Sequence, residues 1–149
     1  MKVLFILILT AMSVSLACCR NEQRQTHDDI HSGYELIQRK DVDGARRVCD
    51  KILYEQSSLD DKDCATLCQL SLLYMHIADY SGNGEDEALA TTCFREAFQA
   101  DSAFAAEFYA NLSTDEAAYG MLLASIARGL DHEEDIAADS LSVDTLSVK

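Results

Sequence analysis

The sequence contains no proline and no tryptophan. Proline lacks an amide hydrogen and clashes with the preceding helical turn, so a chain without it can form helices that are not kinked. Alanine, leucine, glutamate and glutamine, which favour helices, are frequent instead. No run of alternating apolar and polar residues, the pattern typical of a strand, occurs before residue 139. We therefore predict that the fold class is all-α.

Positive charge is also scarce. The chain has 12 lysines and arginines against 26 aspartates and glutamates, which gives a formal net charge of -14. Residues 20–59 are nearly balanced, with seven basic and eight acidic side chains, whereas residues 60–149 have four basic and eighteen acidic ones. Because such a surface repels phosphate groups, we expect no nucleic-acid partner.

Motifs of common enzyme classes are missing from the sequence. It has no Gly-x-Ser-x-Gly, no phosphate-binding glycine loop and no paired carboxylates in a recognisable arrangement. We therefore expect that the chain is not an enzyme and needs no cofactor.

The N-terminus has the pattern of an export signal. Lys2 is followed by an apolar run that ends in small residues at Ser15 and Ala17. From Val3 to Cys19 the segment is shorter than the roughly 20 residues of a membrane-spanning helix. We predict a signal peptide over residues 1–17; an uncleaved anchor and ordinary secretion after Ala17 are the alternatives.

A cysteine pair follows this segment. The sequence before Cys18 and Cys19 resembles the lipobox of bacterial lipoproteins, in which a cysteine becomes the acylated N-terminus. Cys18 is preceded by Ala17 but has Ser15 where leucine is usual, while Cys19 has Leu16 and Ala17 but also the intervening Cys18. The resemblance implies lipidation at Cys18, or alternatively Cys19, and a lipid anchor on the periplasmic or outer face of a bacterial envelope.

Beyond the anchor, apolar residues recur at helical spacing. We expect helices at about 27–40, 43–56, 61–80, 85–100, 103–110 and 114–130. The chain then divides into the signal peptide, a lipidated tether over 18–26, a helical domain over 27–130 and an acidic, low-complexity tail over 131–149. The tail contains two similar units, Asp139–Val143 and Asp144–Val148, which we interpret as disordered, with an added strand as the alternative.

Each expected helix has a characteristic apolar surface. The second and fourth carry a one-sided stripe, and the third is apolar on two faces, which is typical of a helix in the middle of a bundle. The sixth follows Ser113–Glu116, a capping box. Its expected inward stripe consists of Tyr119, Leu122, Leu123, Ile126 and Leu130.

Two helix pairs resemble tetratricopeptide repeats (TPRs). In the second pair, Ala90, Phe94 and Ala97 match the small–bulky–small pattern of that family, although Asp101-Ser102 replaces the usual Asp-Pro. The first pair matches less well, with Gly33 and Ala45 in place but Ile52 where a small residue is usual. The resemblance covers residues 27–102 and implies a TPR-like stack whose concave face binds peptides or partner helices. An unrelated helical bundle is the alternative.

Four cysteines, Cys49, Cys64, Cys68 and Cys93, lie on the expected inward stripes. Buried free thiols are the favoured interpretation; one or two disulfides, or a metal-binding or catalytic role, are alternatives. His27, His31 and Glu35 are spaced four apart, but no motif supports a metal site, so we predict none. We expect His76 in the core.

Basic residues crowd around the first helix–helix turn: Arg39, Lys40, Arg46, Arg47 and Lys51. A solvated salt-bridge cluster is the plain interpretation. Arg46 and Arg47, however, stand near an expected helix N-terminus, where positive charge is unfavourable. These five residues are therefore candidates for binding an acidic partner protein of unknown identity; contact with the acidic half of this chain is the alternative. The function predicted is a membrane-anchored envelope lipoprotein that binds another protein; a cysteine- or metal-based activity and a purely structural lipoprotein are the alternatives.

Overall fold

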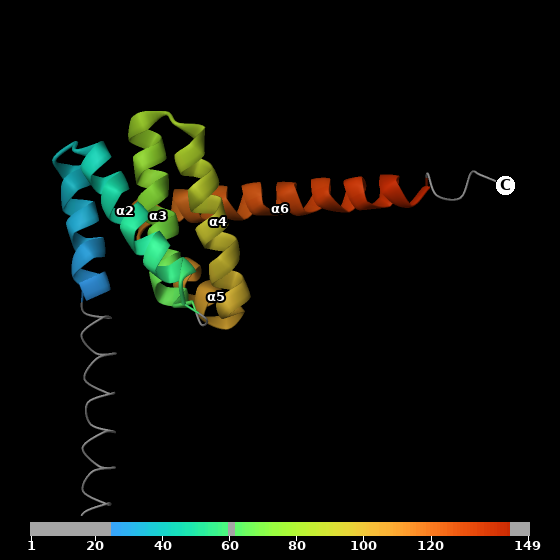
Figure 1. The fold of residues 1–149 in the computed structure, drawn as a ribbon, viewed down its shortest axis with the longest axis horizontal. Coiled ribbons are helices and arrows are strands. Elements are labelled where there is room, and N and C mark those ends of the chain that lie inside the picture. The colour runs from blue at the N-terminus through green and yellow to red at the C-terminus, as the bar shows by residue number, and fades with distance from the viewer. Residues whose placement is uncertain (1–24, 60–61, 144–149) are drawn as a thin grey trace, which may run out of the picture. The chain divides into compact units, whose positions relative to one another are not determined.

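The computed structural model describes residues 25–59 and 62–143, with side chains described up to residue 130. Every regular element in this part of the chain is a helix (Figure 1). The first occupies residues 25–38. The others are α2 (Val42–Ser57), α3 (Cys64–Ser81), α4 (Gly84–Ala100), α5 (Ser102–Ala110) and α6 (Thr114–Val143). The predicted all-α fold class is confirmed.

The helices belong to two compact units, Met1–Ser58 and Leu59–Lys149. The boundary between the units nearly coincides with the change from balanced to acidic composition after Leu59. The helical domain predicted over residues 27–130 therefore spans parts of both units. The TPR-like pairing of its helices stays a prediction.

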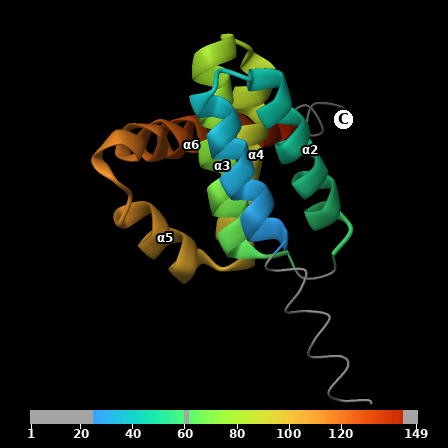
Figure 2. The same cartoon turned by 90° about the vertical axis from the view of Figure 1, so that its left-hand side faces the viewer.

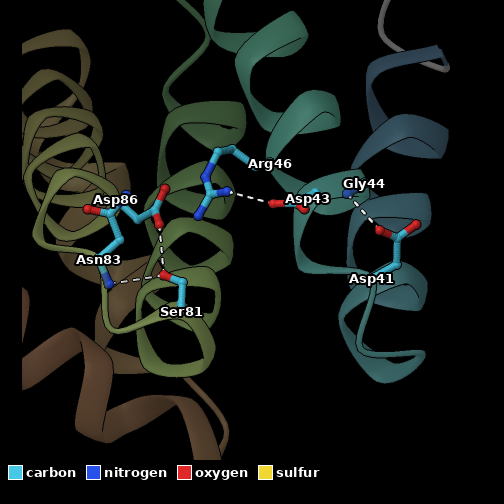
Figure 3. A network of polar contacts seen from close by, with 7 residues as sticks. All are labelled: Asp41, Asp43, Gly44, Arg46, Ser81, Asn83 and Asp86. Atoms are coloured by element: carbon cyan, nitrogen blue, oxygen red, sulfur yellow. Dashed lines mark hydrogen bonds and ion pairs between the residues drawn. The ribbon is translucent and has the colours of Figure 1, made fainter.

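The first unit is a helical hairpin whose turn is made by Lys40 and Asp41. Lys40 has a left-handed backbone (φ 62°) and its amide donates to the carbonyl of Ile37 (2.9 Å), while that of Asp41 donates to Leu36 (2.9 Å). This pair of bonds closes the helix 25–38 as a Schellman motif. Figure 3 shows how Asp41 then opens α2, by accepting a hydrogen bond from the amide of Gly44 (2.9 Å).

In the second unit, α3 and α4 form a longer hairpin. Asp63 caps α3 by accepting from the amide of Ala65 (3.3 Å) and the hydroxyl of Thr66 (2.7 Å). Gly82 ends α3 in the left-handed region (φ 65°), where glycine carries no steric cost. Asn83 caps α4 through the amide of Glu85 (3.1 Å).

A hydroxyl joins the two ends of this turn. The side chain of Ser81 donates to the buried carboxylate of Asp86 (2.9 Å) and accepts from the amide of Asn83 (3.1 Å), as Figure 3 shows. At the other end of the hairpin, Lys62 forms an ion pair with Glu96 (2.7 Å). Polar contacts therefore fix the register of α3 against α4 at both ends.

The interior of the second unit is built on α3, which is buried on nearly all sides, as its sequence predicts. The predicted stripe of α4 is also buried at Ala90, Cys93, Phe94 and Ala97. The rings of Phe94 and Phe98 form a cluster with Tyr109 of α5. The centroid distances are 4.9 Å for Phe94–Phe98, 4.8 Å for Phe94–Tyr109 and 5.9 Å for Phe98–Tyr109. This aromatic cluster holds α5 against the hairpin.

Figure 2 shows α5 and α6 joined by the loop of residues 111–113. Helix α6 contacts α3 and α4 near its start and continues to Val143, beyond its expected end near Leu130 (Figure 1). The first part of the tail predicted over 131–149 thus belongs to α6, whose side chains are described only up to residue 130. Residues 144–149 lie outside the described residues.

Candidate functional site

The five basic residues predicted to bind a partner all lie in the first unit, around its turn and along α2. Three of them form ion pairs inside that unit. Arg39 contacts Glu35 (3.2 Å), Arg46 contacts Asp43 (3.0 Å), and Lys51 contacts Asp29 (2.7 Å). The pKa of Lys51 is raised, chiefly by its hydrogen bond to Asp29. These charges are therefore largely balanced by local carboxylates.

The helix dipole disfavours Arg46 and Arg47 less than the sequence suggests. Helix α2 begins at Val42, so both arginines lie beyond its first turn, where the effect of the helix dipole has declined. Arg46 is half-buried beside Asp43, as Figure 3 shows. Arg47 is exposed, and its guanidinium forms no ion pair with another described residue. Of the two arginines, Arg47 is the one placed to meet a partner.

His27, His31 and Glu35 all lie on the helix 25–38. His27 and His31 are exposed on the helix 25–38, and His31 lies 3.6 Å from Glu35. Among the described side chains, no group of three or more His, Cys, Asp and Glu is arranged to hold a metal ion.

His76 lies half-buried on α3, where it helps to seat α6. Its ring meets that of Tyr119 edge-on at 4.7 Å between centroids, and its Nε2 atom is 4.0 Å from Glu116. Burial lowers the pKa of His76, with Glu116 and Asp79 acting in the opposite direction. The hydroxyl of Tyr119 donates to Asp79 (3.2 Å), so this group of side chains is a packing contact between α3 and α6.

All four cysteines in the described residues are free thiols, and Cys49, Cys68 and Cys93 are buried. Cys64 is partly exposed at the start of α3, and its thiol donates to the carbonyls of Ala97 (3.3 Å) and Asp101 (3.5 Å) at the end of α4. Both carbonyls also accept from backbone amides, that of Ala97 from Asp101 and that of Asp101 from Ala105 (3.0 Å each), so the thiol is an additional donor where α4 meets α5.

Burial also controls the ionisation of these thiols. It raises the pKa of Cys68 and of Cys93 to about 12 in each case, and it raises the pKa of Cys64 as well. Reactive cysteines have lowered pKa values, because the thiolate is the nucleophile and the metal ligand. Burial and raised pKa values therefore favour a packing role for these cysteines over a nucleophilic or metal-binding one.

Two residues of α6 that the sequence predicts to be buried are exposed in the structure. Leu122 and Leu130, expected to face inward, are 45% and 39% exposed. Leu123 is buried as predicted, and Gly120 and Ala127 are buried with it. A Cβ atom at Gly120 would lie 2.9 Å from the side chain of Leu112, so this glycine lets the loop pack on the helix. Together with the contacts of Tyr119, this packing rotates α6 away from the orientation that its apolar stripe predicts.

This rotation leaves an uncharged surface on the other side of α6. We call it the outer face of α6; its members are all exposed and are Ala118, Met121, Leu122, Ser125 and Gly129. Met121 is 70% exposed. Sequence reasoning missed this surface because it assigned Leu122 to the core and treated the alanine, serine and glycine as unremarkable.

The predicted anchor cysteines, Cys18 and Cys19, lie outside the described residues. None of the helices in the described part of the chain is both long and apolar enough to cross a membrane. Comparison with known protein families, characterised proteins and solved structures found no significant match for this chain.

Proposed function

We propose that this chain is a lipid-anchored protein of a bacterial envelope whose helical part binds another protein. The binding part of the proposal depends mainly on one observation, the exposed, uncharged outer face of α6. A monomeric protein exposes single apolar side chains routinely, whereas apolar side chains that adjoin one another on one face mark an interaction surface. The exposed Arg128 lies at the edge of this face, three residues after Ser125. Met121 and Leu122 are the large apolar members of this face.

The anchor part of the proposal depends on the sequence around Cys18. A short positive start, an apolar run and Ala17 directly before the cysteine are the features of a lipoprotein signal. Each methylene of an attached acyl chain contributes roughly 0.8 kcal/mol when buried in lipid, and two chains suffice for stable anchoring. Residues 20–24, which are polar, would then separate the helices from the membrane.

The basic cluster is a second candidate contact, and Arg47 is its best-placed member. An acidic partner would pair with Arg47 without first breaking an ion pair, whereas Arg39, Arg46 and Lys51 already have carboxylates beside them. A thiol-based activity has less support, because raised pKa values make Cys64 and Cys68 weak nucleophiles.

Two measurements test the proposal. Mass spectrometry of the mature N-terminus is expected to find an acylated Cys18, or Cys19; a water-soluble protein with an unmodified N-terminus would contradict the anchor. Tyr54 on α2 is 77% exposed and offers a further probe position in the first unit. Photo-crosslinking in the native cell, with the reactive group placed in turn at Arg47, Tyr54 and Met121, is expected to join the chain to one specific protein from at least one position. Absence of any specific product from all three would contradict a binding role.

A further inference from the structure

The contact that seats α6 on α3 contains an ionisable ring. The imidazole of His76 lies edge-on to the ring of Tyr119, and its Nε2 atom is 4.0 Å from a carboxylate oxygen of Glu116. Only 23% of the His76 side chain and 27% of the Glu116 side chain are exposed. The phenol of Tyr119 donates to Asp79, so this contact also includes a carboxylate from α3.

Burial and charge act on His76 in opposite directions. A half-buried imidazole has lost part of the water that would solvate its charged form, whereas a carboxylate beside it favours that form. Asp79 and Glu116 supply the carboxylates, but burial is the larger effect, so the pKa of His76 is lowered. The neutral ring is therefore the form that suits the seated helix.

The other two helices packed on α3 in this unit, α4 and α5, carry buried or half-buried ionisable groups of their own. Asp86 of α4 accepts a hydrogen bond from Ser81 (2.9 Å). Burial raises the pKa of Cys93 to about 12, and it also raises the pKa of Tyr109. Both groups thus stay neutral at acidic pH, where His76 changes its charge.

Glu116 connects the charge of His76 to the start of α6. The hydroxyl of Ser113 donates to one carboxylate oxygen of Glu116 (3.1 Å) in the capping box of α6, and the other oxygen faces His76. A charged imidazolium attracts a carboxylate more strongly than a neutral ring does. Protonation of His76 would therefore act on the cap that holds the first turn of α6.

The remainder of the seat of α6 is small. Between residues 114 and 130 the buried residues are Gly120, Leu123 and Ala127. A helix held by few buried apolar contacts opens more readily than the rest of a fold. A modest change at the His76 contact is therefore a large part of what keeps α6 in place.

We propose that His76 is an acid-sensitive switch that seats α6 on α3 when its imidazole is neutral and weakens that seating when the ring is protonated. The switch goes beyond the proposed binding function and operates without a partner. Because the unseated ring takes up its proton more readily, seating is fully present above about pH 6.5 and declines as the pH falls below it. One proton changes the equilibrium by at most about tenfold per pH unit.

Two measurements on the protein purified as the cell processes it test the switch. Nuclear magnetic resonance follows the titration of the His76 ring, which we expect below about pH 6.5. Hydrogen exchange, read by mass spectrometry at pH 7 and 5.5 and corrected for the intrinsic exchange rates, follows residues 114–127. We expect their protection to fall at least about threefold more than that of α4 on acidification.

Matched variants assign this response to one residue. His76→Gln keeps a polar side chain that cannot be charged, and it should remove the additional acid response of α6. His31→Gln, at an exposed histidine of the helix 25–38, is the control and should retain it. Glu116→Gln removes a carboxylate that favours the charged ring, so it should shift the His76 titration to lower pH. Circular dichroism confirms that each variant is folded.

Two outcomes would overturn the inference: titration of His76 at or above about pH 6.5, or the same acid response of α6 in the unaltered protein and in His76→Gln. The titration is measured in the unaltered protein and therefore decides the question even where a variant does not fold. The proposed function is judged separately by crosslinking in the cell. A specific crosslinked product without an acid response would leave a binding protein in which His76 serves only in packing.

Discussion

The hydroxyl of Ser71 on α3 lies 2.7 Å from the phenol oxygen of Tyr109 on α5. Ser71 is fully buried and also donates to the carbonyl of Cys68 (2.7 Å), so the phenol of Tyr109 is the donor that completes this pair. A short helix of low intrinsic stability is thereby held to the interior by one specific polar contact as well as by aromatic packing.

Removing this hydroxyl tests the contact directly. We expect Tyr109→Phe to lower the free energy of unfolding by about 1 kcal/mol, because a buried hydrogen bond is lost while the ring remains. Ser71→Ala should cost a similar amount, and the double variant less than the sum of the two. Urea denaturation followed by circular dichroism measures all three. Strict additivity would mean that the two hydroxyls do not interact.

Phe94 is central to the aromatic cluster, with 7% of its surface exposed. Phe94→Ala is expected to destabilise the protein by about 3 to 5 kcal/mol, the usual cost of removing a buried ring. Phe104, also aromatic but 43% exposed, is the control, and its replacement by alanine should cost much less. Equal losses for the two variants in thermal denaturation would show that the cluster is not part of the core.

Alkaline pH should destabilise the fold. Burial raises the pKa of Cys68 and Cys93 from 9.0 to about 12, and it raises the pKa of Tyr109 as well. Between pH 9 and 12 the unfolded chain has therefore lost thiol protons that the folded chain retains, so stability declines as pH rises through this range. Each such group contributes a slope of up to about 1.4 kcal/mol per pH unit.

Urea denaturation under reducing conditions at pH 7, 9, 10 and 11 measures this decline. We expect little change up to about pH 9 and a progressive loss above it. Cys93→Ala, which removes one of the three groups, should show a shallower slope. A flat profile up to pH 11 would mean that the thiols are accessible to water in the folded protein.

Lys40 has a left-handed backbone, which is unfavourable for residues other than glycine. Lys40→Gly should therefore raise the free energy of unfolding by up to about 1 kcal/mol. Lys40→Ala is the control, because alanine carries the same steric cost, and it should leave stability almost unchanged. If thermal denaturation instead shows Lys40→Ala to be as stabilising as Lys40→Gly, the side chain rather than the backbone is responsible.

Charge reversal separates a structural from a binding role in the basic cluster. Arg46→Glu breaks the ion pair with Asp43 and places two carboxylates side by side, so a loss of up to about 1 kcal/mol is expected. Arg47→Glu should leave stability unchanged and weaken partner capture. Pull-down from envelope extract, with melting curves for both variants, distinguishes them. An unchanged set of captured proteins with Arg47→Glu would assign the cluster to the solvated surface.

Most of the fold could be predicted from local patterns. The apolar stripes of α2 and α4 are one-sided, so their buried positions, such as Cys49 and Ala90, follow from the helical period alone. Turn residues with few conformational options gave the boundaries, as at Gly82 and Asn83. The all-helical class and the approximate bounds of the helices, apart from the end of α6 at Val143, needed no information from distant parts of the chain.

The orientation of α6 could not be predicted in this way. Its apolar residues surround more of the helix than one neighbour can cover, so the sequence permits several rotations about the helix axis. The contact of Leu112 with Gly120 and the bond from Tyr119 to Asp79 select one of them, and both depend on where α3 and α5 lie. Sequence period specifies which residues could be buried; because burial needs a partner surface, only the tertiary structure decides that Leu123 is covered and Leu122 is left exposed.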